Sequence, residues 1–215
     1  MITLIVKGAL AYLLGSLIGS LLVGRLRGGV DIRRLGSGNA GGTNALRTQG
    51  KAFAFWVLLI DVGKGWLATG VLAALTLPGI PVGPQGKWLV AVCGIAVMLG
   101  HVYPLWYGFK GGKGVATLIG AVLGAAPLLL LPMLAVWLLS VMLFGYVGLA
   151  SMLGAMTLVI EAGAHPAAHG ALLTFASMAA LLIVYTHRSN IVRMLGGTEP
   201  RARRLWLLGQ RSRSS

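Results

Sequence analysis

Acidic side chains are scarce in this chain: its 215 residues include only Asp31, Asp61, Glu161 and Glu199, against 18 lysines and arginines. Glu161 and Glu199 stand without companions in the sequence, which indicates neither a metal centre nor a pair of catalytic carboxylates. Cysteine is scarcer still, since Cys93 alone lies in an apolar run, and this excludes a disulfide framework and a thiolate metal site. We therefore expect no bound metal.

Polar residues are also too few to cover a soluble fold. Hydrophobic residues make up 57% of the chain and the mean hydropathy is +0.85, which is typical of an integral membrane protein. The formal charge of +14 does not indicate nucleic-acid binding, because the basic residues gather in the gaps between apolar runs. That distribution is the positive-inside pattern of membrane proteins, and we expect no nucleic-acid partner.

The apolar runs predict the first three membrane crossings. Residues 4–24 form the first, which is read as a transmembrane helix and not as a cleaved signal peptide, because no small-residue cleavage site follows. Residues 52–77 and 88–107 predict the second and third, separated by a Pro/Gly turn. Arginines and lysines crowd the loop after the first crossing, so this loop is predicted to be cytoplasmic.

Parity then sets the number of the remaining crossings. The chain is predicted to be on the cytoplasmic side near Lys113 and again at Arg188, so an even number of crossings must lie between these residues. One of them is predicted at 170–186. The uncharged run 115–160 must therefore cross the membrane an odd number of times. It is too long for one crossing, and three short helices are predicted, with breaks offered by Pro127, Pro132 and the sequence GYVG at 145–148. His165 and His169 then fall on the outer surface.

The predicted fold is therefore an all-α polytopic membrane protein. It is a compact bundle of seven transmembrane helices, with the N-terminus outside and the C-terminus cytoplasmic. Residues 1–196 form the membrane-embedded domain, and residues 197–215 form a basic cytoplasmic tail.

Three polar segments fall on the predicted cytoplasmic face: GSGNAGGTNALR at 36–47, GHVYPLWYGFKGGKGVAT at 100–117 and HRSNIVR at 187–193. Each joins a helix end to basic residues and hydrogen-bond donors. Three such loops meeting on one face predict a pocket for an anionic ligand at the cytoplasmic interface.

The first segment matches G-x-G-x-x-G, with Asp61 placed 20 residues after Gly41, but its flanks are membrane helices and not the strand and helix of a dinucleotide-binding fold. A flexible turn without a ligand would explain the glycines. It would not explain why Ser37, Asn39, Thr43, Asn44 and Arg47 occur together.

The second segment resembles a P-loop but is one residue too short before Gly112 and Lys113, and Gly114 replaces the residue that would hold magnesium. What remains is that successive glycine amides at the start of a helix can face a phosphate, with Lys113 adding charge. The alternative is a basic anchor beside the membrane, which fits Lys110 better than Lys113.

Four more polar residues stand at or within the helices. His101 and His187 are predicted at the inner ends of two crossings, beside basic loops, and are candidates for the site. Asp61 and Lys64 lie one turn apart inside the second crossing, where charged groups need a partner. A structural role for this pair is favoured over direct contact with the substrate, and both alternatives stay open.

The three segments, in this order and at this separation, resemble the cytoplasmic motifs of the bacterial acyl-phosphate:glycerol-3-phosphate acyltransferases, the PlsY family. The resemblance covers nearly the whole chain up to about residue 196. It implies a monomeric seven-helix enzyme of the bacterial cytoplasmic (inner) membrane, in contact with membrane lipid and with its active site facing the cytoplasm. The reaction it implies moves a fatty acyl group from acyl phosphate to the 1-hydroxyl of glycerol 3-phosphate, giving lysophosphatidic acid and phosphate, without a metal, nucleotide or other cofactor.

The resemblance also implies which residues act. His101, Ser37, Arg47, Lys113 and Asn190 are the catalytic candidates. The substrate and phosphate contacts would comprise Ser37, Gly38, Asn39, Thr43, Asn44, Arg47, Gly111, Gly112, Lys113, Gly114, Thr117, His187, Asn190 and Arg193. No acid is predicted to orient a histidine, and no H-x4-D sequence occurs. The proton acceptor is left open between a histidine and an oxygen of a bound phosphate.

Two other functions fit parts of the sequence. A membrane transporter of a phosphorylated or anionic solute suits glycine-interrupted helices and paired charges, but it predicts polar residues that continue to the outer face. Here they stop near the cytoplasmic side. A lipid phosphotransferase would need clustered aspartates for metal, which the sequence lacks.

Overall fold

The computed structural model describes residues 1–79, 83–164 and 170–207, and every described regular element longer than a single turn is helical. The chain divides into two compact units, Met1–Pro127 and Leu128–Ser215, a boundary that the sequence analysis does not place. His165 and His169 lie outside the described residues, as does the end of the tail from residue 208.

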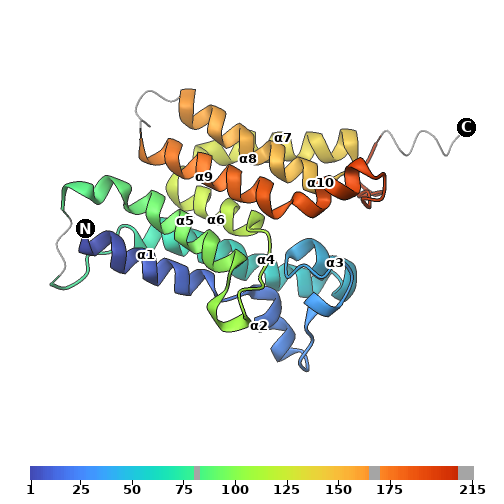
Figure 1. The fold of residues 1–215 in the computed structure, drawn as a ribbon, viewed down its shortest axis with the longest axis horizontal. Coiled ribbons are helices and arrows are strands. Elements are labelled where there is room, and N and C mark those ends of the chain that lie inside the picture. The colour runs from blue at the N-terminus through green and yellow to red at the C-terminus, as the bar shows by residue number, and fades with distance from the viewer. Residues whose placement is uncertain (80–82, 165–169, 208–215) are drawn as a thin grey trace, which may run out of the picture. The chain divides into compact units, whose positions relative to one another are not determined.

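The first unit is built from six α-helices (Figure 1). α1 packs along α5, α4 packs along α6, and the shorter α2 and α3 pack on α4. A six-residue π-helical segment, Leu67–Leu72, continues α4. The helices are α1 (Ile2–Gly15), α2 (Gly19–Leu26), α3 (Gly42–Gln49), α4 (Lys51–Trp66), α5 (Leu89–Val102) and α6 (Val115–Ala125).

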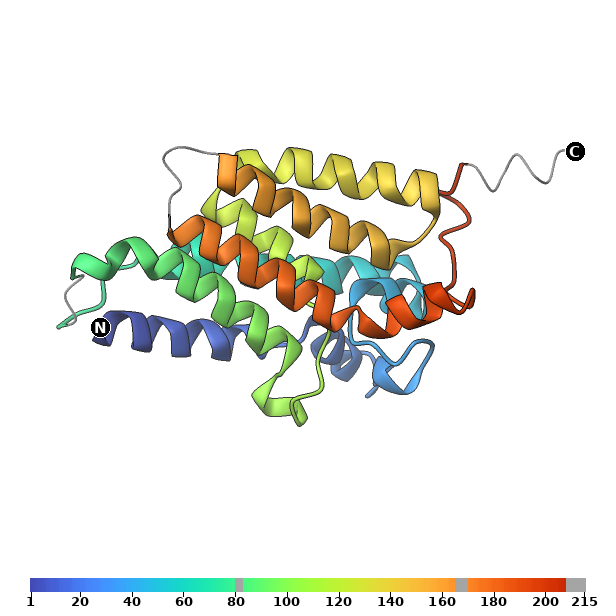
Figure 2. The same cartoon turned by 45° about the horizontal axis from the view of Figure 1, so that its top comes forward.

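The second unit contains four α-helices (Figure 2). α7 packs along α8, and α8 packs along α9, while the short α10 contacts both α8 and α9. The helices are α7 (Leu130–Phe144), α8 (Val147–Ala164), α9 (Ala171–Thr186) and α10 (Arg188–Leu195).

Hydropathy predicts an all-helical chain correctly, and the three helices predicted between residues 115 and 160 correspond to α6, α7 and α8, whereas the short helices α3 and α10 were not predicted. α7 ends before Gly145, at the break that the GYVG sequence predicts, and Gly145 adopts the left-handed conformation. Pro132 does not separate two helices as predicted. It lies in the first turn of α7, where a proline has no intrahelical N–H bond to lose.

The first three crossings differ from prediction: the first is interrupted, and the second and third end earlier than predicted. Residues 4–24 do not form one continuous helix, since α1 and α2 are separated at 16–18 and bent by 44°. The second crossing is helical only to Leu72. The third ends at Val102 because Tyr103 precedes Pro104, and a residue before proline disfavours the helical conformation.

Glycines let the paired helices of the first unit approach closely. A Cβ atom on Gly65 of α4 would collide with the Thr117 carbonyl of α6, and one on Gly120 of α6 would collide with the Val62 carbonyl of α4. Gly15 and Gly100 play the same part between α1 and α5. Such small-residue contacts allow close van der Waals packing where lipid supplies no hydrophobic drive.

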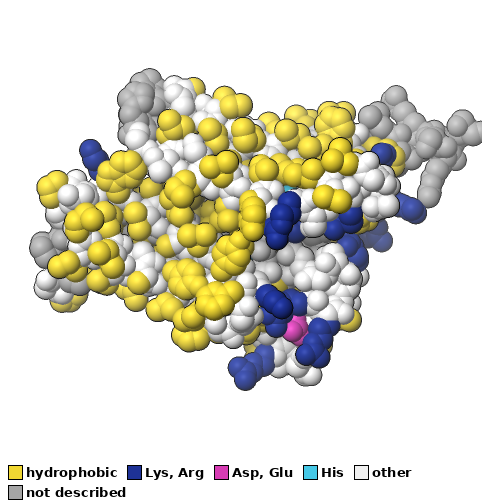
Figure 3. All heavy atoms as spheres, viewed as in Figure 1, with side chains coloured by type: hydrophobic (Ala, Val, Ile, Leu, Met, Phe, Trp, Pro, Cys, Tyr) yellow, Lys and Arg dark blue, Asp and Glu magenta, His cyan; other side chains and the backbone are white. Residues whose placement is uncertain are grey.

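The outward faces of the helices carry large apolar side chains. Phe55, Leu131, Ile160 and Leu181 are each 60–70% exposed, which suits contact with lipid chains. Figure 3 shows hydrophobic side chains over α1 and α5, whereas lysine and arginine side chains gather over the region of α2 and α3. Four described helices are long and apolar enough to cross a membrane, or six if each bent pair counts as one crossing.

The described part of the predicted tail folds back onto the second unit. The Ala202 amide donates to the Gly145 carbonyl at 2.8 Å, and Trp206 Nε1 donates to the Leu143 carbonyl at 3.1 Å. The Arg201 guanidinium lies over the rings of both Tyr146 and Trp206. The predicted domain boundary after residue 196 stays a prediction.

Candidate active site

The loop before α3 carries the first motif and is organised by the buried side chain of Asn44. Asn44 Oδ1 accepts from the Ser37 amide at 3.0 Å, and Nδ2 donates to the carbonyls of Ile32, Leu35 and Asn39, each at 3.0 Å. Because these bonds use both polar atoms of the amide, Asn44 shapes the loop. Its role as a substrate contact stays a prediction.

The other polar side chains of this loop face outward. Ser37, Thr43 and Arg47 are exposed, and Asn39 is half-buried. Across the described ranges, the Ser37 hydroxyl, the Thr43 hydroxyl and the Arg47 guanidinium have no protein partner, so all three can bind a ligand. Positive φ angles at Gly36 (57°) and Gly38 (71°) turn the backbone that presents them.

The second motif begins with His101 at the end of α5 and continues through a glycine-rich loop into α6. The Gly111 amide donates to the Val102 carbonyl and the Gly112 amide to the His101 carbonyl, both at 3.1 Å. These two amides are therefore occupied by the end of α5. The phosphate cradle stays a prediction, and in this structure the N–H groups of Gly111 and Gly112 face backbone carbonyls.

The glycines of this loop are required by the close approach of His101. A Cβ atom on Gly111 would collide with the His101 carbonyl, and one on Gly112 would collide with the Nε2 atom of the ring. Gly114, which precedes α6, has a φ of 88°, a left-handed conformation that favours glycine. Lys113 lies between Gly112 and Gly114 and is half-buried.

Asp61 and Lys64 of α4 form the predicted ion pair, with Nζ 2.9 Å from Oδ1 and both side chains almost fully buried. The pair forms hydrogen bonds with backbone groups at the break between α1 and α2. Lys64 Nζ donates to the carbonyls of Gly15 at 2.9 Å and Leu17 at 2.8 Å, and the Gly19 amide donates to Asp61 Oδ1 at 3.1 Å. These backbone groups would otherwise be unsatisfied within the membrane, which is costly.

His101 joins this pair, which the sequence analysis did not foresee. Its Nδ1 atom lies 2.9 Å from Lys64 Nζ and 3.5 Å from Asp61 Oδ1. The expectation that no acid lies near a histidine is therefore wrong. His101 follows Lys64 by 37 positions in the sequence, so the packing of α4 against α5 brings the three residues together.

The shorter of these contacts defines the chemistry of His101. A lysine ammonium can only donate, so we assign Nδ1 as the acceptor that faces Lys64 and the ring proton to Nε2, on the side of Gly112. The three N–H groups of Lys64 are then shared among Nδ1, Asp61 and the two backbone carbonyls. In this tautomer the imidazole has no free lone pair with which to take a proton. The geometry therefore favours an orienting role for His101 over that of a general base.

Two buried polar atoms near this cluster have no hydrogen-bond partner among the described residues: Asp61 Oδ2 and Thr117 Oγ1. Thr117 lies in the first turn of α6, directly after the glycine-rich loop, where backbone N–H groups are also free of intrahelical bonds. Thr117 is thus buried inside the helix pair and does not present an open contact surface.

The third motif forms the start of α10 in the second unit. Asn190 Nδ2 donates to Glu199 Oε1 at 2.5 Å, and Arg193 Nε donates to Glu199 Oε2 at 2.6 Å. The expectation that Glu199 has no companion is therefore wrong. His187 is buried, with Nδ1 2.8 Å from the Ile183 carbonyl. The first two motifs lie in the first unit, and the convergence of the third with them stays a prediction.

This fold and these motifs define a class: a helical integral membrane protein that presents hydroxyl, amide and basic groups on loops at helix ends. Residues 5–197 match the family described as glycerol-3-phosphate acyltransferase. The chain therefore belongs to the glycerol-3-phosphate acyltransferase family.

Named relatives and solved structures agree with this assignment. The glycerol-3-phosphate acyltransferase of Staphylococcus carnosus is 39% identical over 194 residues, covering 89% of this chain and 94% of that protein. That of Paramagnetospirillum magneticum is 42% identical over 193 residues, covering 88% and 89%. The crystal structure of PlsY (YgiH), an integral membrane glycerol 3-phosphate acyltransferase, in its glycerol 3-phosphate form, has a TM-score of 0.79 and 37% identity, covering 92% and 94%.

Proposed function

We propose that this protein transfers a fatty acyl group from acyl phosphate to the 1-hydroxyl of glycerol 3-phosphate, giving lysophosphatidic acid and inorganic phosphate. The observation that carries the proposal is the structural likeness, over 92% of the chain, to an acyltransferase solved in a glycerol 3-phosphate form and in a lysophosphatidic acid form. The outward-facing side chains of the first motif support it, since they offer a planar cation and two hydroxyls to a phosphate-bearing ligand.

Each part of the site receives a role in this proposal. Arg47 binds a phosphate through its planar fork, and Ser37 and Thr43 supply hydroxyl contacts. Lys113 adds a second positive charge at the start of α6. His187, Asn190 and Arg193 of the third motif complete the predicted set.

The reaction proceeds by attack of the glycerol hydroxyl oxygen on the acyl carbon. A new C–O ester bond forms, the bond between the acyl carbon and the phosphate oxygen breaks, and the bonding electrons leave with phosphate. The hydroxyl proton passes to a phosphate oxygen, because His101 Nδ1 is already occupied by Lys64. Phosphate is a good leaving group, so the protein has to orient the reactants and stabilise the developing charges.

The seven-helix topology also belongs to this proposal. We infer seven crossings by counting the four long apolar helices, each of the two bent pairs as one crossing, and the shorter apolar helix α6 as the seventh. The basic loops then place the N-terminus outside and the active site and C-terminus on the cytoplasmic side of the bacterial inner membrane. The protein would act as a monomer, with the acyl chain of its substrate lying among the helices and membrane lipid.

The test is an assay of the purified protein with labelled glycerol 3-phosphate. Lysophosphatidic acid should form with acyl phosphate as donor and should not form at a comparable rate with acyl-CoA. The loops offer phosphate-sized anion sites but no soluble domain for a large nucleotide carrier. Equal turnover with acyl-CoA would show that the proposed donor is wrong.

A further inference from the structure

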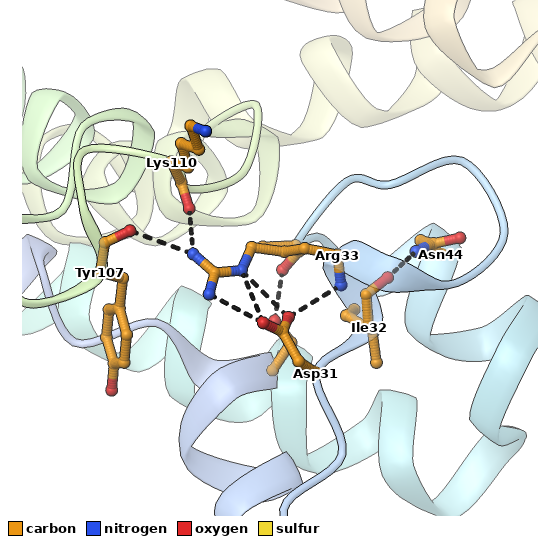
Figure 4. A network of polar contacts seen from close by, with 8 residues as sticks. Asp31, Ile32, Arg33, Asn44, Tyr107 and Lys110 are labelled. Carbon is orange, nitrogen blue, oxygen red and sulfur yellow. Dashed lines mark hydrogen bonds and ion pairs between the residues drawn. The ribbon is translucent and has the colours of Figure 1, made fainter.

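Arg33 joins two loops that lie far apart in the sequence (Figure 4). Its Nε and Nη2 atoms contact the Asp31 carboxylate at 2.8–3.2 Å, and its Nη1 atom donates to the carbonyls of Tyr107 and Lys110, both at 3.1 Å. Asp31 also accepts from the Arg33 amide at 3.0 Å, which fixes the turn from which the guanidinium extends.

This arrangement uses the shape of a guanidinium. One edge of the fork pairs with a carboxylate, and the remaining nitrogen reaches two carbonyls on the opposite loop. A lysine ammonium has three donors on a single atom and cannot span both sets. The side chains of Arg33 and Asp31 are only about one-quarter exposed (26% and 28%), so water competes with these bonds less than at an open surface.

The electrostatics agree with the geometry. The hydrogen bonds and charge of Arg33 hold the pKa of Asp31 below its ordinary value, and Asp31 in turn raises the pKa of Arg33. Both groups are outside the membrane-spanning helices, and both are charged across the physiological range.

The two carbonyls that Arg33 binds belong to the part of the second-motif loop where the backbone is most constrained. Phe109, between them, has a φ of 57°, a left-handed conformation that is strained for a residue with a side chain. Lys110 is followed directly by Gly111 and Gly112, whose amides bond to the end of α5. Arg33 thus holds the loop three residues before Lys113.

A cavity of about 530 Å³ opens beside this contact. Its lining includes Arg33, Arg34, Gly38, Tyr107, Lys110 and Gly111, so residues of the first and the second motif both line it. Loss of the Arg33 contacts would therefore change both the wall of the cavity and the spacing of the two motifs.

We propose that Arg33 is a positioning residue of the acyltransferase: with Asp31 it clasps the loop 103–114 to the loop 27–41, and so fixes the placement of Lys113 relative to the first motif. Arg33 itself does not touch the reacting atoms. The inference rests on the proposed function for its kinetic consequence, but the clasp can be tested without it.

The kinetic test compares Arg33→Ala, Arg33→Lys and Asp31→Asn with Arg27→Ala. Arg27 is an exposed arginine on the same loop and is absent from the cavity lining. We expect kcat/KM for glycerol 3-phosphate to fall roughly 10- to 100-fold in Arg33→Ala, as expected for a misplaced binding group. Arg33→Lys should be nearly as impaired, Asp31→Asn should be intermediate, and Arg27→Ala should match the wild type.

Chemical rescue separates positioning from general destabilisation. Guanidinium chloride at a sub-denaturing concentration should restore part of the activity of Arg33→Ala, whereas the same concentration of potassium chloride should not. A variant that had lost its fold would not respond. Absence of rescue together with a collapsed thermal transition would overturn the proposal in favour of a purely structural role.

Hydrogen–deuterium exchange tests the clasp independently of catalysis. Peptides covering residues 103–114 should exchange faster in Arg33→Ala and Arg33→Lys than in the wild type, and should be unchanged in Arg27→Ala. Unchanged exchange in Arg33→Ala would refute the clasp. If the wild type formed no lysophosphatidic acid, the proposed function would fail while the exchange result would still decide the clasp.

Discussion

Lys64 Nζ lies 2.9 Å from Nδ1 of His101, which places an ammonium against one of the two ring nitrogens. A histidine beside a candidate substrate loop invites the role of general base, but here its Nδ1 atom faces the Lys64 ammonium. The relationship makes His101 part of the support for the second-motif loop, and it leads to a test of its role.

His101→Asn should keep part of the activity, because the amide oxygen can still accept from Lys64. The fall in kcat/KM should be smaller than the roughly 10²–10⁴-fold loss expected when a general base is removed. The pH profile of kcat/KM should keep its acidic limb in the variant. Disappearance of that limb would identify His101 as the base.

Lys64→Met should destabilise the protein strongly, because Asp61 loses its cationic partner and the carbonyls of Gly15 and Leu17 lose their side-chain donor. Loss of one partner of a buried pair costs about 3–5 kcal/mol. Thermal unfolding in detergent measures the effect, with the exposed Lys51→Met on the same helix as control. Equal Tm values for the two variants would contradict this interpretation of the buried pair.

Arg47→Lys should be damaged nearly as badly as Arg47→Ala, because lysine keeps the positive charge but loses the planar, bidentate geometry. KM for glycerol 3-phosphate and for acyl phosphate, measured separately, would show which phosphate Arg47 holds. Both variants should retain the wild-type Tm, since Arg47 is exposed. Near-normal kinetics in Arg47→Lys would mean that charge alone suffices.

Gly112→Ala should displace the His101 ring, because the added methyl group would occupy the position of Nε2. Overpacking of this kind costs about 1–3 kcal/mol, and we expect a clear loss of activity with it. Gly63→Ala is the matched control, since a Cβ at Gly63 meets no atom within 4 Å. Comparable activity in the two variants would show that the contact with His101 is not needed.

The topology can be tested by thiol labelling in a Cys93→Ala background. Single cysteines at Gly41, Lys110 and Ser189 should be protected from an impermeant reagent in intact cells, because their loops are predicted to be cytoplasmic. A cysteine at Gln85, in the exposed turn before α5, should react. Reaction at any of the first three positions would disprove the predicted orientation.

The elements of the fold could be predicted because hydropathy and the parity of basic loops act over whole segments. The ion pair of Asp61 and Lys64 could be predicted as well, since their spacing on one helix is local information. The addition of His101 could not, because it depends on how closely α4 approaches α5. The break in the first crossing was missed for the same reason, since the donor that satisfies it comes from another helix.

Within the motifs, residue type alone could not separate groups that bind a ligand from groups that shape a loop. Asn44, Gly111 and Gly112 look like ligand contacts in the sequence, yet their polar groups bond to the protein itself. Glu199 looked isolated because its partners lie six and nine positions away, across a turn. Arg33 and Asp31 stand just before the first motif, and their i, i+2 spacing was the one signal that could have drawn attention to them.

The bend between α1 and α2 also bears on the order in which the protein is made. The Gly15 and Leu17 carbonyls receive their side-chain donor from Lys64, which is translated 49 and 47 residues later. When the first hydrophobic segment has been synthesised, Lys64 has not yet been added to the chain. The bent segment can therefore reach its final hydrogen-bonded form only after α4 has been inserted beside it, and biogenesis of the first crossing is coupled to that of the second.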